Sequence, residues 1–238
     1  MNEFSNILFL DIETVSNASS YDLLSDREKK HWLRKTRYLR QGDENKSSAE
    51  LYSESAGIYA EFGKIIVIAV GMILVNEKGE PWIKVKYLAN HDEKILLQEF
   101  ISLLNKFNNI TLKLCAHNGK EFDFPYLCRR MIINGIPLPD VLNYSGKKPW
   151  EVPFVDTMEL WKFGDYKHYT ALDLLATLFD IPSSKISMDG SEVSSVYYED
   201  KNLQKIAYYC VEDVIVLIQV FLKLKMVPII KPENIVRT

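Results

Sequence analysis

The sequence predicts a mixed α/β domain, and three observations indicate this class. A short continuous apolar run at residues 7–10 is typical of a strand buried on both faces of a sheet. A longer run at residues 65–75 is rich in β-branched side chains, which favour strands. The longest segment with apolar residues at helical spacing covers residues 202–225. Strands followed by a helix, another strand and more helices give a mixed α/β domain.

Length and composition bound the organisation of the chain. Its 238 residues are 47% hydrophobic and 26% charged, so length alone allows one large or two small globular domains. The formal net charge is -3 and the pI is about 5.9. Bulk charge therefore gives no general attraction to nucleic acid, and any such contact needs a local basic patch.

Cysteine usage and the apolar runs indicate the compartment. The three cysteines are odd in number and none is spaced as CxxC, which excludes a disulfide framework and a zinc knuckle. Residues 1–4 lack a basic n-region and an apolar h-region, so we expect no signal peptide. The run at residues 65–75 is too short to span a bilayer. We therefore expect a cytoplasmic protein without a membrane partner.

A helical insertion is predicted after the first strand and a polar loop at residues 16–20. It covers about residues 21–60 and contains helices at 27–40 and 51–59, joined by a polar loop at 41–48. The apolar positions 32/33 and 38/39 of the first helix predict one buried face. The basic residues of that helix are Arg27, Lys29, Lys30, Arg34, Lys35, Arg37 and Arg40. They form either a phosphate-contacting surface beside the carboxylates described below or a solvated helix face.

The other elements follow in order along the chain. Residues 65–75 and 82–88 are expected to form a hairpin through a turn at 76–79, and residues 112–116 a short strand. Helices are predicted at residues 91–107, 122–133, 154–161, 170–179 and 202–225. Irregular segments are predicted at residues 135–153, at residues 180–193 and in a tail formed by the last ten residues.

Two carboxylates follow the first apolar run with one residue between them. Side chains alternate along a strand, so Asp11 and Glu13 project from the same side at its end. Two such acids repel each other and raise each other's pKa, and a bound divalent cation removes that conflict. The alternative is a pair of solvated acids in a loop.

Further acids occur on two predicted helices. Asp123 lies at the start of one helix, where it is either a ligand or a helix N-cap. Tyr209 and Asp213 are four residues apart and share one face of the last long helix. They are either part of a site or a hydrogen-bonded pair inside the core. Glu212 points elsewhere around the helix.

Taken together, these residues resemble the three motifs of the DEDD exonuclease superfamily. The motifs are Asp11-x-Glu13, then Asn118-Gly119-x-x-Phe122-Asp123, then Tyr209-x-x-x-Asp213. The tyrosine marks the DEDDy branch, which includes the proofreading domain of family B DNA polymerases and ribonuclease D, and argues against the DEDDh branch. The resemblance covers about residues 7–224. Residues near Asp156, 163–165 and 172–175 also look like stand-alone bacterial proteins related to that polymerase domain.

The resemblance implies a ribonuclease H-like fold, a mixed β-sheet flanked by helices, in a single 3′-5′ exonuclease domain over residues 1–238. It implies two divalent cations, Mg²⁺ or Mn²⁺, held by Asp11, Glu13, Asp123 and Asp213. By resemblance Asp11 bridges the cations, Glu13 and Asp213 hold the one that carries the nucleophile, and Asp123 holds the second through water. Tyr209 orients or helps to deprotonate the attacking water.

The expected substrate is the free 3′ end of single-stranded DNA, which is released as nucleoside 5′-monophosphates. A ribonuclease D-like exoribonuclease and a catalytically silent nucleic-acid-binding module are the alternatives. Candidate substrate contacts are Thr14, Asn118, Phe122, Arg34 and Arg37. Thr14 equally fits a loop start, and Asn118 a turn. Asp156 is a further site acid or a helix cap, and the four histidines lack zinc-ligand spacing.

Overall fold

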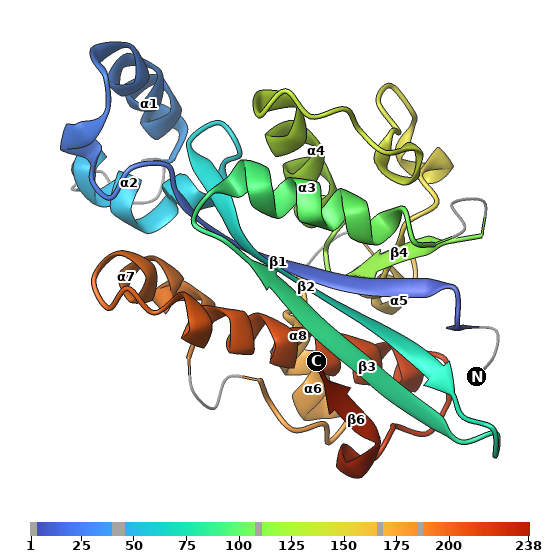
Figure 1. Ribbon diagram of the computed structural model, residues 1–238. Helices are drawn as coiled ribbons and strands as arrows, with labels where there is room; N and C mark the ends of the chain where they lie inside the picture. Colours follow the sequence, from blue (N-terminus) through green and yellow to red (C-terminus); the bar gives the residue numbers. More distant parts are fainter. Residues whose placement is uncertain (1–3, 40–45, 108–110, 166–168, 185–187) are drawn as a thin grey trace.

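A mixed sheet forms the centre of the molecule in a computed structural model that describes residues 4–39, 46–107, 111–165, 169–184 and 188–238 (Figure 1). Among these residues the strand order is β5-β4-β1-β2-β3-β6. The pairs β1–β2 and β2–β3 are antiparallel, and the other neighbours are parallel. The strands are β1 Ile7–Ser16, β2 Gly63–Val75, β3 Pro81–Ala89, β4 Lys113–Ala116, β5 Val155–Asp156 and β6 Ile235–Arg237.

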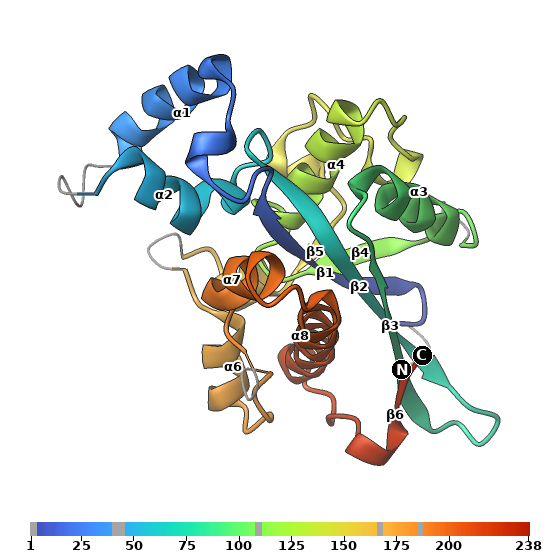
Figure 2. The ribbon, with the colours of Figure 1, turned by 60° about the vertical axis from the view of Figure 1, so that its left-hand side comes forward.

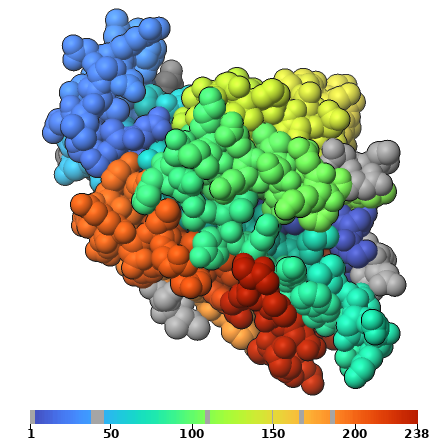
Figure 3. Space-filling model, viewed as in Figure 1, coloured from blue at the N-terminus to red at the C-terminus, as the bar shows by residue number. Residues whose placement is uncertain are grey.

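Helices cover both faces of this sheet, as Figure 2 shows, with α3 and α4 on one face and α6, α7 and α8 on the other. The insertion that carries α1 and α2 stands out as a lobe at one corner (Figure 3). The α-helices are α1 Asp26–Leu39, α2 Ser48–Ser55, α3 Glu93–Leu104, α4 Asp123–Ile133, α5 Thr157–Lys162, α6 Leu172–Leu178, α7 Val193–Tyr198 and α8 Leu203–Leu224. The short 3-10 helices are Tyr21–Leu23, Ala56–Ile58, Asp140–Leu142, Pro149–Glu151, Gly190–Glu192 and Pro232–Asn234.

Alternation along β1 divides its side chains between two cores. Leu8 and Leu10 pack into the core under α3 and α4. Ile7 and Phe9 pack into the core under α8. Because side chains on a strand point to opposite faces in turn, the odd-numbered acids of β1 lie on the same side as α8.

Close packing sets the distance between α8 and the sheet. A Cβ atom on Gly71 of β2 would lie 2.8 Å from side-chain carbons of Val214 and Ile218. No real Cβ atom tolerates that contact, so a glycine is required where α8 crosses β2. Helix α8 therefore sits near enough to the sheet for its polar residues to reach β1.

A buried ion pair holds the other acid-bearing helix, α4, in place. Arg130 of α4 donates to both carboxylate oxygens of Glu93 at the start of α3 and to the carbonyl of Ala60. Glu93 also accepts from the backbone N–H of Ile65. These charge-assisted bonds satisfy the two buried charges and connect α4 to α3 and β2.

Strand β1 is longer than the sequence pattern indicates. We expected Asp11 and Glu13 at the end of the strand, but β1 continues to Ser16, with a bulge between Glu13 and Thr14. Strand β2 supplies the partners that extend it, whereas β4 pairs only with Ile7–Phe9. The acids therefore lie just beyond the last residue paired with β4, where one edge of β1 is free for other contacts.

Two further expectations were wrong because distant residues supply the pairing, and one helix was missed. Residues 154–156 were expected to be helical, but Val155–Asp156 pairs with β4, and α5 begins at Thr157. Helix α7 was not predicted at all. The last ten residues are not a free tail: β6 pairs with β3, and Gln219 of α8 exchanges two hydrogen bonds with the backbone of Ile230.

Candidate active site

Four carboxylates from three separate parts of the chain come together on the α8 side of the sheet. Asp11, Asp123 and Asp213 line one cavity of about 550 Å³. Glu13 does not line this cavity and is 8% exposed, and its carboxylate lies within 4.8 Å of that of Asp11. Burial raises the pKa of Asp11 well above its usual range, and the charges of Asp123, Glu13 and Asp213 raise it further. The structure therefore brings these four acids close enough for their charges to interact.

Asp123 is the most deeply buried of the four, at 3% exposed. Burial raises its pKa to about 7, although hydrogen bonds from its own backbone N–H and that of Ile12 act in the opposite direction. Ile12 lies beyond the part of β1 that pairs with β4, so its backbone is available for this contact. The N-cap of α4 is Phe122, so the alternative that Asp123 is a helix N-cap was wrong.

Two buried oxygens in this cavity lack a hydrogen-bond partner among the described residues. They are Oδ1 of Asp123 and Oδ1 of Asn118. A buried polar atom without a partner is unfavourable unless a ligand or ion satisfies it. A buried cluster of carboxylates with an unsatisfied oxygen fits a hard divalent cation such as Mg²⁺ or Mn²⁺, which prefers oxygen ligands.

Tyr209 points its hydroxyl group toward the acids. It hydrogen-bonds to Asp213, and burial together with the charges of Asp213, Glu13 and Asp11 raises its pKa far above the usual range. The phenol therefore stays protonated and acts as a donor. A Cβ atom on Gly190 would lie 3.7 Å from this hydroxyl, so the turn that begins α7 closes this side of the site.

Sequence reasoning missed two neighbours of the acids. Ser184 donates from its Oγ to Oδ1 of Asp213. Cys210 lies 3.3 Å from Oδ2 of Asp11, and the ligand atoms of Asp11, Glu13 and Cys210 all lie within 4.8 Å of one another. The position of Cys210 one residue after Tyr209 and three before Asp213 was the available signal, because all three lie on adjoining faces of one helix.

Asp156 shapes the site without belonging to it. Its carboxylate accepts from the backbone N–H groups of Asn118, Lys120 and Met158. Asp156 therefore caps α5, and its carboxylate also holds the loop that precedes Asp123. Gly119 is required in that loop, since a Cβ there would lie 2.4 Å from the Cβ of Ala116.

His117 also lines the cavity, and sequence reasoning did not single it out. Its Nε2 lies 2.8 Å from the carbonyl oxygen of Thr170 and its Nδ1 lies 2.8 Å from Oγ1 of Thr157. A carbonyl only accepts, so Nε2 carries the hydrogen. Burial lowers the pKa of His117, which keeps the ring neutral. The imidazole therefore fixes the segment next to Tyr169, an exposed aromatic residue that lines the cavity.

The sequence-predicted substrate contacts divide into two groups. Asn118 and Phe122 line the cavity with the acids. Asn118 also occupies a turn with φ at 59°, as the alternative for it required. Thr14 does not line the cavity, because its hydroxyl donates to the carbonyl of Gly57, 2.8 Å away. That bond holds the turn that brings Ile58 to the cavity wall.

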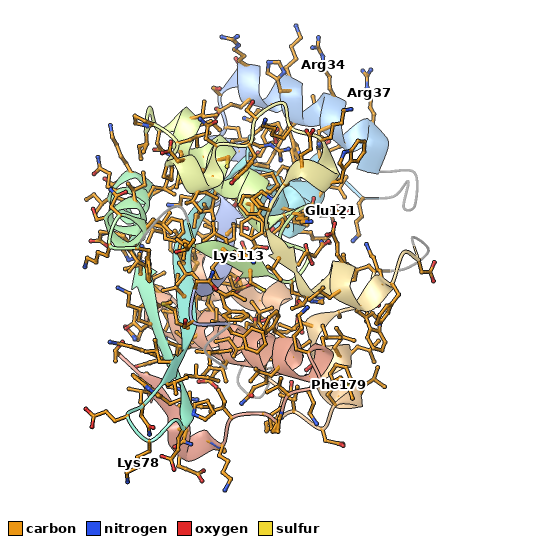
Figure 4. The ribbon with its side chains drawn as sticks, turned by 90° about the vertical axis from the view of Figure 1, so that its right-hand side faces the viewer. Arg34, Arg37, Lys78, Lys113, Glu121 and Phe179 are labelled. Atoms are coloured by element: carbon orange, nitrogen blue, oxygen red, sulfur yellow. The ribbon has the colours of Figure 1, made fainter. Side chains whose placement is uncertain are left out.

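Arg34 and Arg37 lie on the exposed side of α1 and project away from the body of the molecule (Figure 4). The buried face of α1 is formed by Trp32 and Thr36, whereas Leu33, which was expected to be buried, is 45% exposed. Arg34 lines a separate hollow with His31 and Lys35. The structure thus keeps these cations apart from the carboxylates. Arg40 and His168 lie outside the described residues.

Comparison with known proteins identifies the family. A family profile described as "predicted 3′-5′ exonuclease related to the exonuclease domain of PolB" matches residues 58–229, more than half of the chain. The chain belongs to this family. The matched part contains Asp123, Tyr209 and Asp213 but begins after β1, so Asp11 and Glu13 join the set through the three-dimensional structure. No curated protein matches the chain.

One solved structure supports the predicted fold class. The family B DNA polymerase from the hyperthermophilic archaeon Pyrobaculum calidifontis is similar over 92% of this chain, with a TM-score of 0.54 and 14% sequence identity. The similar part spans 24% of that polymerase, so the chain corresponds to about a quarter of its length. The fold is ribonuclease H-like, as predicted. None of the described helices has the length and hydropathy that a membrane span requires.

Proposed function

We propose that this protein is a metal-dependent exonuclease that removes nucleotides from the 3′ end of single-stranded DNA and releases nucleoside 5′-monophosphates. The observation that carries the proposal is the convergence of three carboxylates in one cavity, with Glu13 close enough for its charge to act on Asp11 and with Oδ1 of Asp123 unsatisfied. Burying several like charges together is unfavourable unless cations neutralise them. The family described above, whose members are predicted 3′-5′ exonucleases, supports the same reaction.

The residues present suit two divalent cations, Mg²⁺ or Mn²⁺. Asp11, Glu13, Asp123 and Asp213 would hold them, and the pKa of Asp11 is raised by the charges of all three other acids. When bound, such a pair of cations supplies an activated water and neutralises charge on the phosphate that is attacked. The protein itself fixes the four carboxylates on rigid elements, namely β1, α4 and α8.

Tyr209 acts as a hydrogen-bond donor in this proposal. Its raised pKa keeps the hydroxyl protonated in the metal-free protein, so it can donate to the attacking water or to a phosphate oxygen. Ser184 holds Asp213 from the other side and limits its rotation. Both residues thereby pre-organise the side of the site formed by α8.

The terminal nucleotide would contact residues on the cavity wall. Phe122 offers an aromatic face for a nucleobase, and the unsatisfied amide oxygen of Asn118 offers an acceptor. Thr14 does not line the cavity and its hydroxyl is already bonded, so it would contribute only through its backbone. Arg34 and Arg37 would contact phosphates farther along the strand, outside the cavity.

The proposal covers the whole chain, residues 1–238, as one exonuclease unit in the cytoplasm, with the α1–α2 lobe as an insertion. The three cysteines are free thiols, which agrees with a reducing compartment. An exoribonuclease with the same site differs only in contacts to the 2′-hydroxyl. The test below therefore compares DNA with RNA as the substrate.

An end-labelled single-stranded oligonucleotide tests the proposal directly. We expect a ladder of products shortened by single nucleotides with Mn²⁺ or Mg²⁺ and intact substrate with EDTA. Asp11→Ala and Asp213→Ala should abolish the ladder, whereas Asp200→Ala, at an exposed position away from the cavity, should not. Matching DNA and RNA oligonucleotides rank the two substrate classes. Retention of the oligonucleotide without cleavage in any metal would overturn the proposal in favour of a silent binding module.

A further inference from the structure

A second cavity lies beside the amino-terminal end of α4 and is not needed by the proposed reaction. It has a volume of about 580 Å³ and lies between α4 and the segment at residues 138–154. Phe124, Tyr144 and Phe154 supply aromatic lining, and Lys120, Arg129 and Lys147 supply positive charge. Its volume falls within the range of about 300–1,000 Å³ that is typical of small-ligand sites.

The aromatic lining is rigid. The rings of Phe124 and Phe154 have centroids 4.0 Å apart at an interplanar angle of 34°, and Tyr144 packs edge-on to Phe154 at 5.3 Å. Phe124 and Phe154 are buried in the core, whereas Tyr144 is half-buried. A wall of fixed aromatic rings with one partly exposed member suits a planar heterocycle.

The charges around the opening favour an anionic group. Lys120 forms an ion pair with Glu159 at 2.6 Å, which leaves that pair neutral. Glu121 is the other acid at the cavity and lies on the face seen in Figure 4. Arg129 and Lys147 outnumber it, and Arg129 is exposed on α4. A phosphate attached to the heterocycle would therefore meet a net positive rim.

The two cavities share the amino-terminal end of α4. Asp123 faces the acids, while the next residue, Phe124, lines the second cavity. Lys120 and Glu121 belong to the loop between them, and the bonds from that loop to Asp156 hold it in shape. This loop and the first turn of α4 therefore separate the second cavity from the acids.

We infer that this second cavity, lined by Phe124, Tyr144 and Phe154 and flanked by Arg129 and Lys147, is a nucleotide-binding subsite. The inference rests on the proposed function for the kind of ligand that reaches it. The ligand is a nucleobase that carries a phosphate, either within the substrate strand or as a released mononucleotide. Stacking against Tyr144, the one of the three rings that is half-exposed, gives affinity that is independent of base identity.

Two neighbouring isoleucines on α4 provide a matched test. Ile132 lines the cavity and is 64% exposed, whereas Ile133 is 55% exposed and does not line it. Ile132→Trp fills the opening without changing the buried core, and Ile133→Trp adds the same side chain outside it. Arg129→Gln removes the rim charge. Far-ultraviolet circular dichroism and thermal denaturation of the three variants establish that each is folded.

The first arm measures binding of adenosine 5′-monophosphate by calorimetry in EDTA, so that no cleavage is needed. We expect Ile132→Trp to weaken binding at least about five-fold, which is the lower end of what one base stack contributes. Arg129→Gln should weaken it as well, and Ile133→Trp should match the wild type. Equal binding by Ile132→Trp and Ile133→Trp, or no binding by the wild type, would overturn assignment to a free mononucleotide.

The second arm measures hydrolysis of a trinucleotide and of a dodecanucleotide. If the cavity holds a nucleotide of the strand, Ile132→Trp raises KM for the longer substrate several-fold and leaves kcat and the trinucleotide unchanged. The subsite is refuted if Ile132→Trp and Ile133→Trp behave alike in both arms. If the wild type binds adenosine monophosphate but cleaves nothing, the proposed function fails while the subsite stands, so the two failures are distinguishable.

Discussion

Removing one buried charge from the acid cluster should stabilise the metal-free protein. We choose Asp123→Asn, because Asp123 is 3% exposed and its pKa is raised to about 7 by burial. The amide keeps one oxygen to accept the bonds from the Asp123 and Ile12 backbones. Its nitrogen takes the place of the unsatisfied Oδ1 and can donate to a neighbouring carboxylate.

The size of the effect follows from the pKa. A rise from 3.8 to about 7 means that the folded state binds a proton more tightly than the unfolded state does. At about 1.4 kcal/mol per pKa unit, ionised Asp123 costs the fold at most about 4 kcal/mol. Asp11 and Glu13, whose pKa values are also raised, take up protons in its place, so we expect about 2 kcal/mol.

The sign of the pH dependence follows from the same values. A carboxyl whose pKa is raised in the folded state leaves the fold most stable below the unfolded value near 3.8. That stability is lost as the pH rises to about 7 and stays lost above it. The wild type should therefore be less stable than Asp123→Asn at pH 8 and equally stable near pH 4.5.

Thermal denaturation in EDTA, followed by circular dichroism, measures this difference. For a chain of this size, about 2 kcal/mol corresponds to a Tm increase of about 4–8 °C for Asp123→Asn at pH 8. Addition of Mn²⁺ should raise the Tm of the wild type more than that of the variant. Asp200→Asn at an exposed position serves as the control and should not differ from the wild type. A variant that is no more stable at pH 8, or equally so at both pH values, would refute the reasoning.

Three other predictions test further parts of the structure. Tyr209→Phe should lower kcat by about 100-fold through loss of one donor while the Mn²⁺ binding midpoint stays unchanged, and a shifted midpoint would count against the orienting role. His117 has a lowered pKa, so its imidazole opposes the gain in stability that the buried acids give as the pH falls through about 6.5, and His117→Gln should gain more than the wild type does; equal slopes of Tm between pH 7.5 and 5.5 contradict this. Neutralising Arg34 and Arg37 together should reduce the salt slope of single-strand binding by about 0.7 for each lost phosphate contact, and an unchanged slope would make α1 a solvated face.

Much of the fold was predictable because its periodicities are local. The runs at residues 7–10 and 65–75 became β1 and β2, and residues 202–225 became α8 with ends shifted by one residue. The errors have a different origin. Strands β5 and β6 have two and three residues and exist only because β4 and β3 offer edges to pair with. No pattern within so short a segment encodes that pairing.

The same distinction holds for the candidate site. Spacing alone placed Asp11 with Glu13 on one face of a strand and Tyr209 with Asp213 on one face of a helix, because those relations depend only on strand and helix geometry. The alternatives for Asp156 and Asn118 were also resolved in favour of capping and turn formation. Ser184 escaped notice because serines in loops are common and its partner lies 29 residues away.

By itself, the sequence determined the kinds of chemical group and their local arrangement: carboxylates in pairs, a phenol one helical turn before an acid, and strands and helices of recognisable period. Only the tertiary structure decided that the acids of β1 face α8 rather than α3, that Cys210 meets Asp11 across 199 residues, and that Arg34 and Arg37 lie apart from them. The reason is physical. These contacts form because whole faces of helices and sheet pack against one another. That packing depends on many residues that are far apart in the chain.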